Sequence, residues 1–191
     1  MDPIKLFTKW YQEEQHLCNI KIPSACCFST NGLDGYPNAR FVSLKEVLDG
    51  RFIITGPVSS RKGREILKST KTSLSFWWTV TERQVRIQGD ATKISDQHAD
   101  NYFNERSRES QLISLISKQG MTLENIQQLN DDYQKAIFDF TGKEIPRPAD
   151  WGGYSINPVR IEFLKFNKAR FHERILFERK KEQWTVRHVQ P

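Results

Sequence analysis

The stretch that decides the fold is residues 25 to 55, which read ACCFSTNGLDGYPNARFVSLKEVLDGRFIIT. Three short runs of apolar and β-branched residues lie within it, and turn-forming dipeptides separate them. The runs are Ala25 to Ser29, Ala39 to Val47 and Phe52 to Thr55, and the breaks are Asn31-Gly32, Asp34-Gly35 and Asp49-Gly50. Asn-Gly and Asp-Gly pairs favour the tight turns that join antiparallel strands. The stretch therefore predicts a β-meander.

Helical periodicity appears in four places around this meander. These are the first fifteen or so residues, Gly63 to Thr70, a segment capped by Ser95 or Asp96 that runs past Tyr102, and a segment from Thr122 to Gly142. The first has a favourable start, because Asp2 can cap it and proline is well tolerated at the first helical position. The last carries one apolar face from Leu123 to Phe140. We expect the last two helices to pack on the sheet.

Further strand-like segments flank these helices. They are Thr72 to Thr79, Arg83 to Ile94, Val159 to Phe166, Arg170 to Glu178 and Trp184 to Val189. A proline-bearing connector, Glu144 to Pro148, precedes the last three, and a charged turn from Arg179 to Gln183 joins the final pair. There is no internal repeat and no clear boundary. The sequence predicts one α+β domain over residues 1–191, a mainly antiparallel barrel with peripheral helices.

Composition limits the possible partners and cofactors. The 191 residues include 37% apolar side chains, which is enough for a hydrophobic core, and the net charge of +6 makes anions attractive partners. The positive residues are spread through strand-like segments, which favours a pocket over a polybasic tail. Three cysteines without a CxxC pair and four histidines without ligand spacing predict neither disulfides nor a metal site. The absence of a signal-peptide pattern predicts a cytoplasmic protein.

Three clusters could carry chemistry. Arg170, His172 and Arg174 alternate along a predicted strand and would share one face, so a solvated surface and a site for an anion or electron-rich ring explain them equally well. Arg40 to Lys45 and Ser59 to Arg64 bring cations and hydroxyls to the start of a short helix, which slightly favours a phosphate site.

The third cluster is Tyr102, Arg106 and Ser110, whose spacing of four places them in one stripe on a continuous helix. An ordinary solvated face explains this stripe better than a phosphate clasp does. Gln84 lies on a predicted strand, where its amide could contact the edge of a heterocycle.

The sequence lacks several common catalytic motifs. GxxxxGK[ST], GxGxxG, HExxH and GxSxG are all absent. Any chemistry therefore requires an organic cofactor, or the protein is a bare binding module. Nucleic-acid binding is an alternative hypothesis, because Trp77 and Trp78 lie near basic strands and aromatic rings can stack on bases. Adjacent tryptophans in a strand more often pack in a core.

Taken in order, these segments resemble the pyridoxamine 5'-phosphate oxidase family. The matching stretches are Arg40 to Lys45, Ser60-Arg61-Lys62, Glu82 to Val85, Tyr102-Phe103 with Arg106 and Ser110-Gln111, Pro146 to Tyr154, Arg160 to Phe163, and Arg170 to Arg174. The likeness covers nearly the whole chain, and the Arg-x-His-x-Arg segment is its most distinctive part.

The resemblance implies an FMN-binding split β-barrel and a homodimer that holds FMN at the subunit interface. The implied flavin contacts are Arg40, Phe41, Val42, Ser43, Leu44, Lys45, Ile54, Thr55, Arg61, Lys62, Gln84, Gln119, Gly120, Leu164 and Arg174. The implied substrate contacts are Lys45, Tyr102, Arg106 and Ser110 for the phosphate, with the catalytic pair Arg170 and His172 for the pyridine ring.

The implied reaction is the oxidation of pyridoxine or pyridoxamine 5'-phosphate to pyridoxal 5'-phosphate, with O2 as acceptor and H2O2 released. Neither nucleic acid nor a membrane is an implied partner. The chain departs from the family pattern at Leu164, where a flavin-contacting Trp is usual, at Gly120, where Ser is usual, and at Ile54, often Tyr. Related split-barrel oxidases and reductases act on other rings, including phenazine precursors, which leaves the substrate open.

Overall fold

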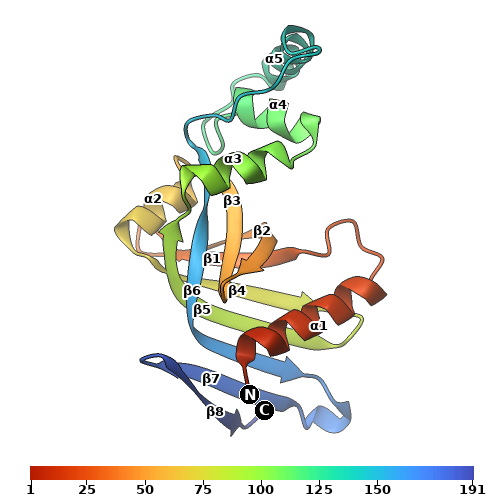
Figure 1. The fold of residues 1–191 in the computed structure, drawn as a ribbon, viewed down its shortest axis with the longest axis vertical. Coiled ribbons are helices and arrows are strands. Elements are labelled where there is room, and N and C mark those ends of the chain that lie inside the picture. Colours follow the sequence, from red (N-terminus) through yellow and green to blue (C-terminus); the bar gives the residue numbers. More distant parts are fainter. The chain divides into compact units, whose positions relative to one another are not determined.

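The computed structural model describes residues 1–191 as a barrel-forming sheet with five helices (Figure 1). The helices are α1 (Pro3–Leu17), α2 (Arg61–Lys68), α3 (Asp96–Asn104), α4 (Arg108–Ile116) and α5 (Ile126–Asp139). The strands are β1 (Ala25–Asn31), β2 (Pro37–Leu48), β3 (Arg51–Pro57), β4 (Lys71–Trp78), β5 (Arg83–Lys93), β6 (Trp151–Lys165), β7 (Glu173–Lys180) and β8 (Gln183–Val189).

The sheet closes on itself. Its strand order is β3-β2-β1-β4-β5-β6-β7-β8, and an additional β3–β6 pairing joins the first strand to the sixth. Six strands therefore form an antiparallel barrel, and the β7–β8 hairpin continues the sheet beyond β6 (Figure 1). The predicted α+β split barrel and its β1–β3 meander are confirmed.

The chain divides into two compact units. The first, called the barrel unit here, comprises residues Met1–Ile54, Glu65–Thr92 and Ser155–Pro191. The second, called the helical unit, comprises residues Thr55–Arg64 and Lys93–Tyr154.

The core of the barrel unit is aromatic, and α1 supplies part of it. Phe7 is fully buried and packs edge-on against Phe52 and Phe76, with ring centroids 4.8 and 5.1 Å apart. Asp2 caps α1 by accepting a hydrogen bond from the backbone N–H of Ile4 at 2.8 Å. Because the helix is capped and most of its apolar side chains are buried or half-buried, the predicted amphipathic N-terminal helix is confirmed.

The helical unit has a smaller aromatic core. Phe103 on α3 is fully buried and packs edge-on against Trp151, at a centroid distance of 5.1 Å. Ser95 caps α3 as predicted, with its hydroxyl accepting from the His98 N–H. None of the helices combines the length and apolar character that a membrane crossing requires.

Several predicted boundaries are wrong. Strand β6 begins at Trp151 rather than at Val159, since the Gly-rich start of this segment hides its extended character. Helix α5 begins at Ile126, after the cap Asn125, and not at Thr122. Helix α2 covers Arg61–Lys68, two residues earlier than predicted.

Candidate functional site

The start of α2 places a lysine amine in a polar, nearly buried position. Lys62 is 8% exposed, and its Nζ donates to Ser60 Oγ at 3.0 Å and to Gln119 Oε1 at 2.9 Å. The Ser60 hydroxyl in turn donates to the carbonyl of Pro57 at 2.7 Å. Ser60 and Lys62, which belong to one cluster predicted from the sequence, are therefore brought together with Gln119, a flavin contact implied by the resemblance.

Gly63 makes this arrangement possible through a close backbone approach. A Cβ at this position would overlap the carbonyl oxygen of Val58 and lie 2.6 Å from its carbonyl carbon and 3.0 Å from Tyr154 Oη. Any side chain would therefore push the first turn of α2 away from the preceding loop. Glycine at 63 fixes where Arg61 and Lys62 begin the helix.

Gly120, which follows Gln119, has a left-handed backbone with φ of 87°. Nothing lies within 4 Å of a Cβ built there, so backbone conformation and not space favours glycine. Glycine therefore suits this backbone position, whatever the space around it.

Arg106 is another cation of the helical unit, and its Nε has no hydrogen-bond partner. Its Nη2 donates to the Ser110 carbonyl at 3.2 Å and to Ser114 Oγ at 3.4 Å, while its guanidinium lies 5.1 Å from the Trp151 ring centroid. Its Nε is buried without a hydrogen-bond acceptor. Burial lowers the pKa of Arg106 from its usual value, yet an arginine remains charged. A buried donor on a charged group is suited to an anionic ligand.

The continuous helix predicted to carry Tyr102, Arg106 and Ser110 is wrong. Helix α3 ends at Asn104 and α4 starts at Arg108, with Ser107 capping α4 through the Ser110 N–H. The break still brings Arg106 to Ser110, because its side chain reaches across the gap to the Ser110 carbonyl. Tyr102 is buried and stacks on His98 instead.

The strand predicted over Arg170 to Glu178 begins only at Glu173, and before it lie a short 3-10 helix, η1 (Lys168–Arg170), and a turn at residues 170–172. Ala169 and Arg170 have positive φ angles of 57° and 64°. Phe171, with φ −77° and ψ 65°, is the central residue of an inverse γ-turn. The His172 N–H closes this turn by donating to the Arg170 carbonyl at 2.9 Å. Arg170, His172 and Arg174 therefore do not alternate on one strand face. Arg170 is exposed, and Arg174 alone lies on β7.

Arg174 belongs to a charge network on the barrel unit. Its Nε and Nη2 donate to Glu162 Oε1 at 3.2 and 2.6 Å, and Arg86 Nη2 donates to Glu162 Oε2 at 2.6 Å. Burial of Glu162 opposes its ionisation, but the hydrogen bonds from Arg86 and Arg174 outweigh burial, and the pKa of this carboxyl lies below its usual value. Two arginines share one carboxylate, so the network carries one net positive charge.

Arg40 has internal partners. Its guanidinium donates to Thr30 Oγ1 at 2.6 Å, to the Phe28 carbonyl at 3.2 Å and to Glu65 Oε2 at 2.9 Å. Glu65 is fully buried and also accepts from Asn38 at 2.8 Å. The side chain of Arg40 thus neutralises a buried carboxylate and holds β2 to β1.

The remaining predicted flavin contacts lie on the strands of the barrel unit or at the start of the helical unit. On β2, Leu44 is buried while Phe41 is 79% exposed and Lys45 is exposed. Leu164 is 8% exposed and is the cross-strand partner of Arg174. The others are Val42 and Ser43 on β2, Ile54 and Thr55 on β3, and Gln84 on β5 opposite Trp77.

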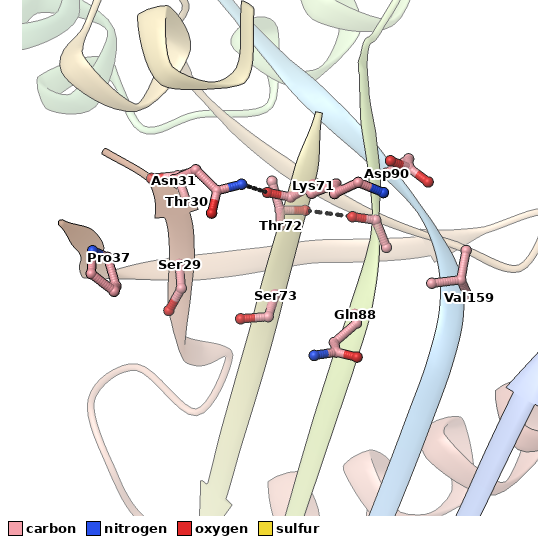
Figure 2. Close-up of a pocket in the computed structure, with 11 residues that line it drawn as sticks. Ser29, Thr30, Asn31, Pro37, Lys71, Thr72, Ser73, Gln88, Asp90 and Val159 are labelled. Atoms are coloured by element: carbon pink, nitrogen blue, oxygen red, sulfur yellow. Dashed lines mark hydrogen bonds between the residues drawn. The ribbon is translucent and has the colours of Figure 1, made fainter. Parts of the chain in front are cut away.

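Two pockets lie on the barrel unit. Figure 2 shows one of about 380 Å³, where Ser29, Ser73 and Gln88 come from three neighbouring strands and the Asn31 side chain donates to the Lys71 carbonyl at 3.3 Å. None of the predicted cofactor or substrate residues lines it. A second pocket of about 360 Å³ is lined by Arg86, Arg160 and Glu162, and so borders the network that holds Arg174.

Sequence reasoning missed the partners of the predicted residues. Glu162, Arg86 and Glu65 lie in alternating strand or short-helix segments that give no pairing information. The polar character of Glu65 and Glu162 at buried positions was the available signal. Asn167 was also missed, and it holds the turn before His172 through bonds to Phe171 and Glu173.

The fold and these clusters define an antiparallel split-barrel protein whose helical unit carries two cations suited to anionic ligands. Comparison with protein families gives this class a name. Residues 12–144 match the family described as pyridoxamine 5'-phosphate oxidase, and residues 151–191 match the pyridoxine 5'-phosphate oxidase C-terminal dimerisation region. The chain belongs to the pyridoxamine 5'-phosphate oxidase family, as its sequence resemblance predicted.

Individual relatives agree with this placement. The chain is 39% identical over 190 residues to the pyridoxine/pyridoxamine 5'-phosphate oxidase of Leptospira biflexa, covering 100% of this chain and 89% of the relative. It is 37% identical over 191 residues to the enzyme of the same name from Bacteroides thetaiotaomicron, with 100% and 89% covered. Among solved structures, PhzG from Burkholderia lata, in complex with tetrahydrophenazine-1-carboxylic acid, superposes with a TM-score of 0.93 at 26% identity, covering 100% of this chain and 93% of that one.

Proposed function

We propose that this chain is an FMN-dependent oxidase that converts pyridoxine 5'-phosphate or pyridoxamine 5'-phosphate to pyridoxal 5'-phosphate. The acceptor is O2 and the by-product is H2O2, and with the amine substrate a water molecule is also consumed and ammonia is released. One observation carries the proposal beyond family membership. The helical unit contains two separate cations suited to phosphate, Lys62 and Arg106, and in this reaction the cofactor and the substrate each bring one phosphate.

Lys62 and Arg61 fit the phosphate of FMN. The Lys62 amine is nearly buried among oxygen acceptors, and the first turn of α2 offers backbone N–H groups and the positive end of the helix dipole. Cations at a helix start oppose that dipole, so a bound phosphate would relieve an unfavourable arrangement. In the proposal Gln119 orients the lysine, and Gly120 supports the turn behind it.

Arg106 fits the substrate phosphate. Its buried Nε has no acceptor, and leaving a buried donor unsatisfied costs roughly 1–3 kcal/mol, with a higher cost for charged groups. An incoming phosphate oxygen would satisfy this donor and form a charge-assisted hydrogen bond. Ser110 and Tyr102 are the other proposed phosphate contacts of the helical unit, and the resemblance adds Lys45 on β2 as a substrate residue. Trp151 holds the guanidinium plane, so the fork is preorganised.

The barrel unit supplies the proposed ring contacts. FMN, when bound, supplies the two-electron oxidation and the reaction with O2. The residues Arg40 to Lys45, Ile54, Thr55, Gln84, Leu164 and Arg174 are proposed to hold it, with Arg40 ordering β2 from inside. Arg174 would contribute a positive charge tempered by Glu162. Arg170 and His172 are proposed to orient the substrate ring, and orientation is worth several kcal/mol of barrier, on the order of 7.

A homodimer is part of the proposal. Residues 151–191 match a family dimerisation region, and the barrel unit exposes large aromatic side chains that a partner subunit would cover. Phe41 is 79% exposed, Trp77 55% and Phe171 78%. Exposed aromatics of this size are enriched at protein interfaces.

A second candidate is a split-barrel flavin oxidase for another ring, such as a reduced phenazine carboxylic acid. The TM-score of 0.93 to PhzG supports it, as does Leu164, which offers more room than a Trp at the same position. Such a substrate carries a carboxylate and lacks the phosphate that would use Arg106.

One assay separates these candidates. Purified protein is loaded with FMN and mixed in air with pyridoxine 5'-phosphate, and then with the unphosphorylated alcohol. The proposal expects pyridoxal 5'-phosphate and H2O2 in equal amounts from the phosphate ester, and a much lower kcat/KM for the alcohol because the phosphate binding energy is lost. Flavin binding without any pyridoxal 5'-phosphate would favour the second candidate.

A further inference from the structure

The turn before β7 holds His172 in a defined way. The backbone N–H of Asn167 lies 3.2 Å from His172 Nδ1. The Asn167 side chain reaches the other end of the turn, where its Nδ2 donates to the Phe171 carbonyl at 3.3 Å and to Glu173 Oε1 at 2.9 Å. One residue therefore closes the turn around His172 with three hydrogen bonds.

The chemistry of the backbone bond fixes the tautomer of His172. A backbone N–H can only donate, so Nδ1 must present its lone pair to Asn167. In a neutral imidazole the proton then resides on Nε2. The free ring nitrogen of His172 is therefore a hydrogen-bond donor and has no lone pair in the ring plane to take up a proton.

Aromatic packing fixes the ring plane as well. The His172 ring packs against Phe166, with centroids 4.7 Å apart and planes inclined at 58°. Phe166 in turn lies edge-on to Trp77 at 4.9 Å. Rotation of the imidazole would break both the Phe166 contact and the bond from Asn167, so the direction of its Nε2–H is set by neighbours within the barrel unit.

We infer that Asn167 and Phe166 are positioning residues that lock His172 as the Nε2–H tautomer, so that it donates a hydrogen bond to an oxygen or nitrogen acceptor on the ring substrate. This inference rests on the proposed function for the identity of the acceptor. The assignment of the tautomer does not depend on the proposed function. His172 thus acts as a donor that orients the ring and not as the base that removes a proton from it.

The tautomer can be read directly from ring-nitrogen chemical shifts. Protein labelled with nitrogen-15 is studied as the purified FMN-loaded protein at alkaline pH, where ordinary histidines are neutral, and His172 is assigned by comparison with His172→Gln. We expect a pyridine-like shift for Nδ1 and a pyrrole-like shift for Nε2. A pyrrole-like Nδ1, or averaged shifts for both nitrogens, would overturn the inference whatever reaction the enzyme catalyses.

Three variants test the positioning roles. Asn167→Asp keeps the size of the side chain but replaces its donors with a carboxylate facing Glu173, and Phe166→Leu removes the ring contact. Both should move the two His172 nitrogen shifts toward averaged values. Lys168→Ala, in the same turn and exposed, is the control and should leave them in place. Unchanged shifts in Asn167→Asp and Phe166→Leu would refute their roles, and the signals of His16, His98 and His188 report whether each variant is folded.

A matched pair at 172 tests the donor role in turnover. The amide nitrogen of Gln can replace Nε2 of histidine, whereas that of Asn more closely replaces Nδ1. We expect His172→Gln to retain about tenfold more kcat/KM than His172→Asn with pyridoxine 5'-phosphate, which is the worth of one hydrogen bond. Equal losses would contradict the donor role. A wild-type protein with the expected tautomer but no oxidase activity would instead reject the proposed function and leave the tautomer standing.

Discussion

Replacing Gly63 with alanine should disturb the start of α2 more than the size of a methyl group suggests. The new Cβ would overlap the carbonyl oxygen of Val58, a backbone atom that cannot move without shifting its loop. Overpacking costs about 1–3 kcal/mol, and contact with backbone belongs at the upper end of this range. Alanine in a helix recovers about 1 kcal/mol relative to glycine. The net destabilisation of Gly63→Ala is therefore about 2 kcal/mol.

Gly152→Ala is the matched control because it faces the same residue without a clash. A Cβ there would meet a Val58 methyl at 3.5 Å and Lys93 Cε at 3.9 Å, both ordinary contacts. For a chain of this size 1 kcal/mol corresponds to about 2–4 °C, so Gly63→Ala should lower Tm by about 4–8 °C and Gly152→Ala by about 1 °C or less.

Thermal unfolding followed by circular dichroism measures the stability difference, and quenching of FMN fluorescence measures the affinity for the flavin. Gly63→Ala should also weaken FMN binding, because the displaced helix start carries Arg61 and Lys62. Wild-type Tm and wild-type flavin affinity in Gly63→Ala would refute the close approach at Val58 and the role given to this helix start.

Three further substitutions probe the charged groups. Lys62→Met should raise the Kd for FMN by about 10- to 150-fold, which is the range expected from the loss of one charge-assisted hydrogen bond. An unchanged Kd in a titration with FMN would exclude Lys62 from the flavin site. Arg106→Lys should raise KM for pyridoxine 5'-phosphate about tenfold or more, because lysine lacks the paired N–H donors of the guanidinium group. FMN should still bind to this variant. Loss of FMN with an unchanged KM would contradict the assignment of Arg106 to the substrate phosphate. Glu162→Gln removes a carboxylate whose folded pKa is depressed, so its contribution is present above the ordinary value of 4.5 and is lost as pH falls through the folded pKa. In Glu162→Gln, Tm at neutral pH should fall and the loss of stability below about pH 4.5 should become shallower, whereas wild-type acid behaviour would show that the network contributes little.

The sequence predicted the barrel because its strands are separated by strong turn signals. Asn31-Gly32 and Asp49-Gly50 mark two hairpins, and the alternating composition of the strands fits a surface buried on one side. The start of β6 was missed because Gly152 and Gly153 lower its apparent strand propensity, although long-range pairing decides their conformation.

The sequence predicted which residues belong to the candidate site, but it did not predict how their side chains are arranged. Lys62 and Gln119 are far apart in sequence. Only the family resemblance implied that both contact the flavin, and the structure shows them hydrogen-bonded to each other. The turn before β7 could not be foreseen, because Ala169 and Arg170 both have positive φ and neither is a glycine, the residue that such a conformation favours. The buried pairing of Arg40 with Glu65 likewise depends on packing that no local pattern encodes.

The most direct test of the account is product identification under air. FMN-loaded protein is incubated with pyridoxine 5'-phosphate, and the products are identified by mass spectrometry while oxygen uptake is recorded. We expect one mole of pyridoxal 5'-phosphate to form for each mole of oxygen consumed. A yellow, folded protein that consumes no oxygen and leaves pyridoxine 5'-phosphate unchanged would contradict it.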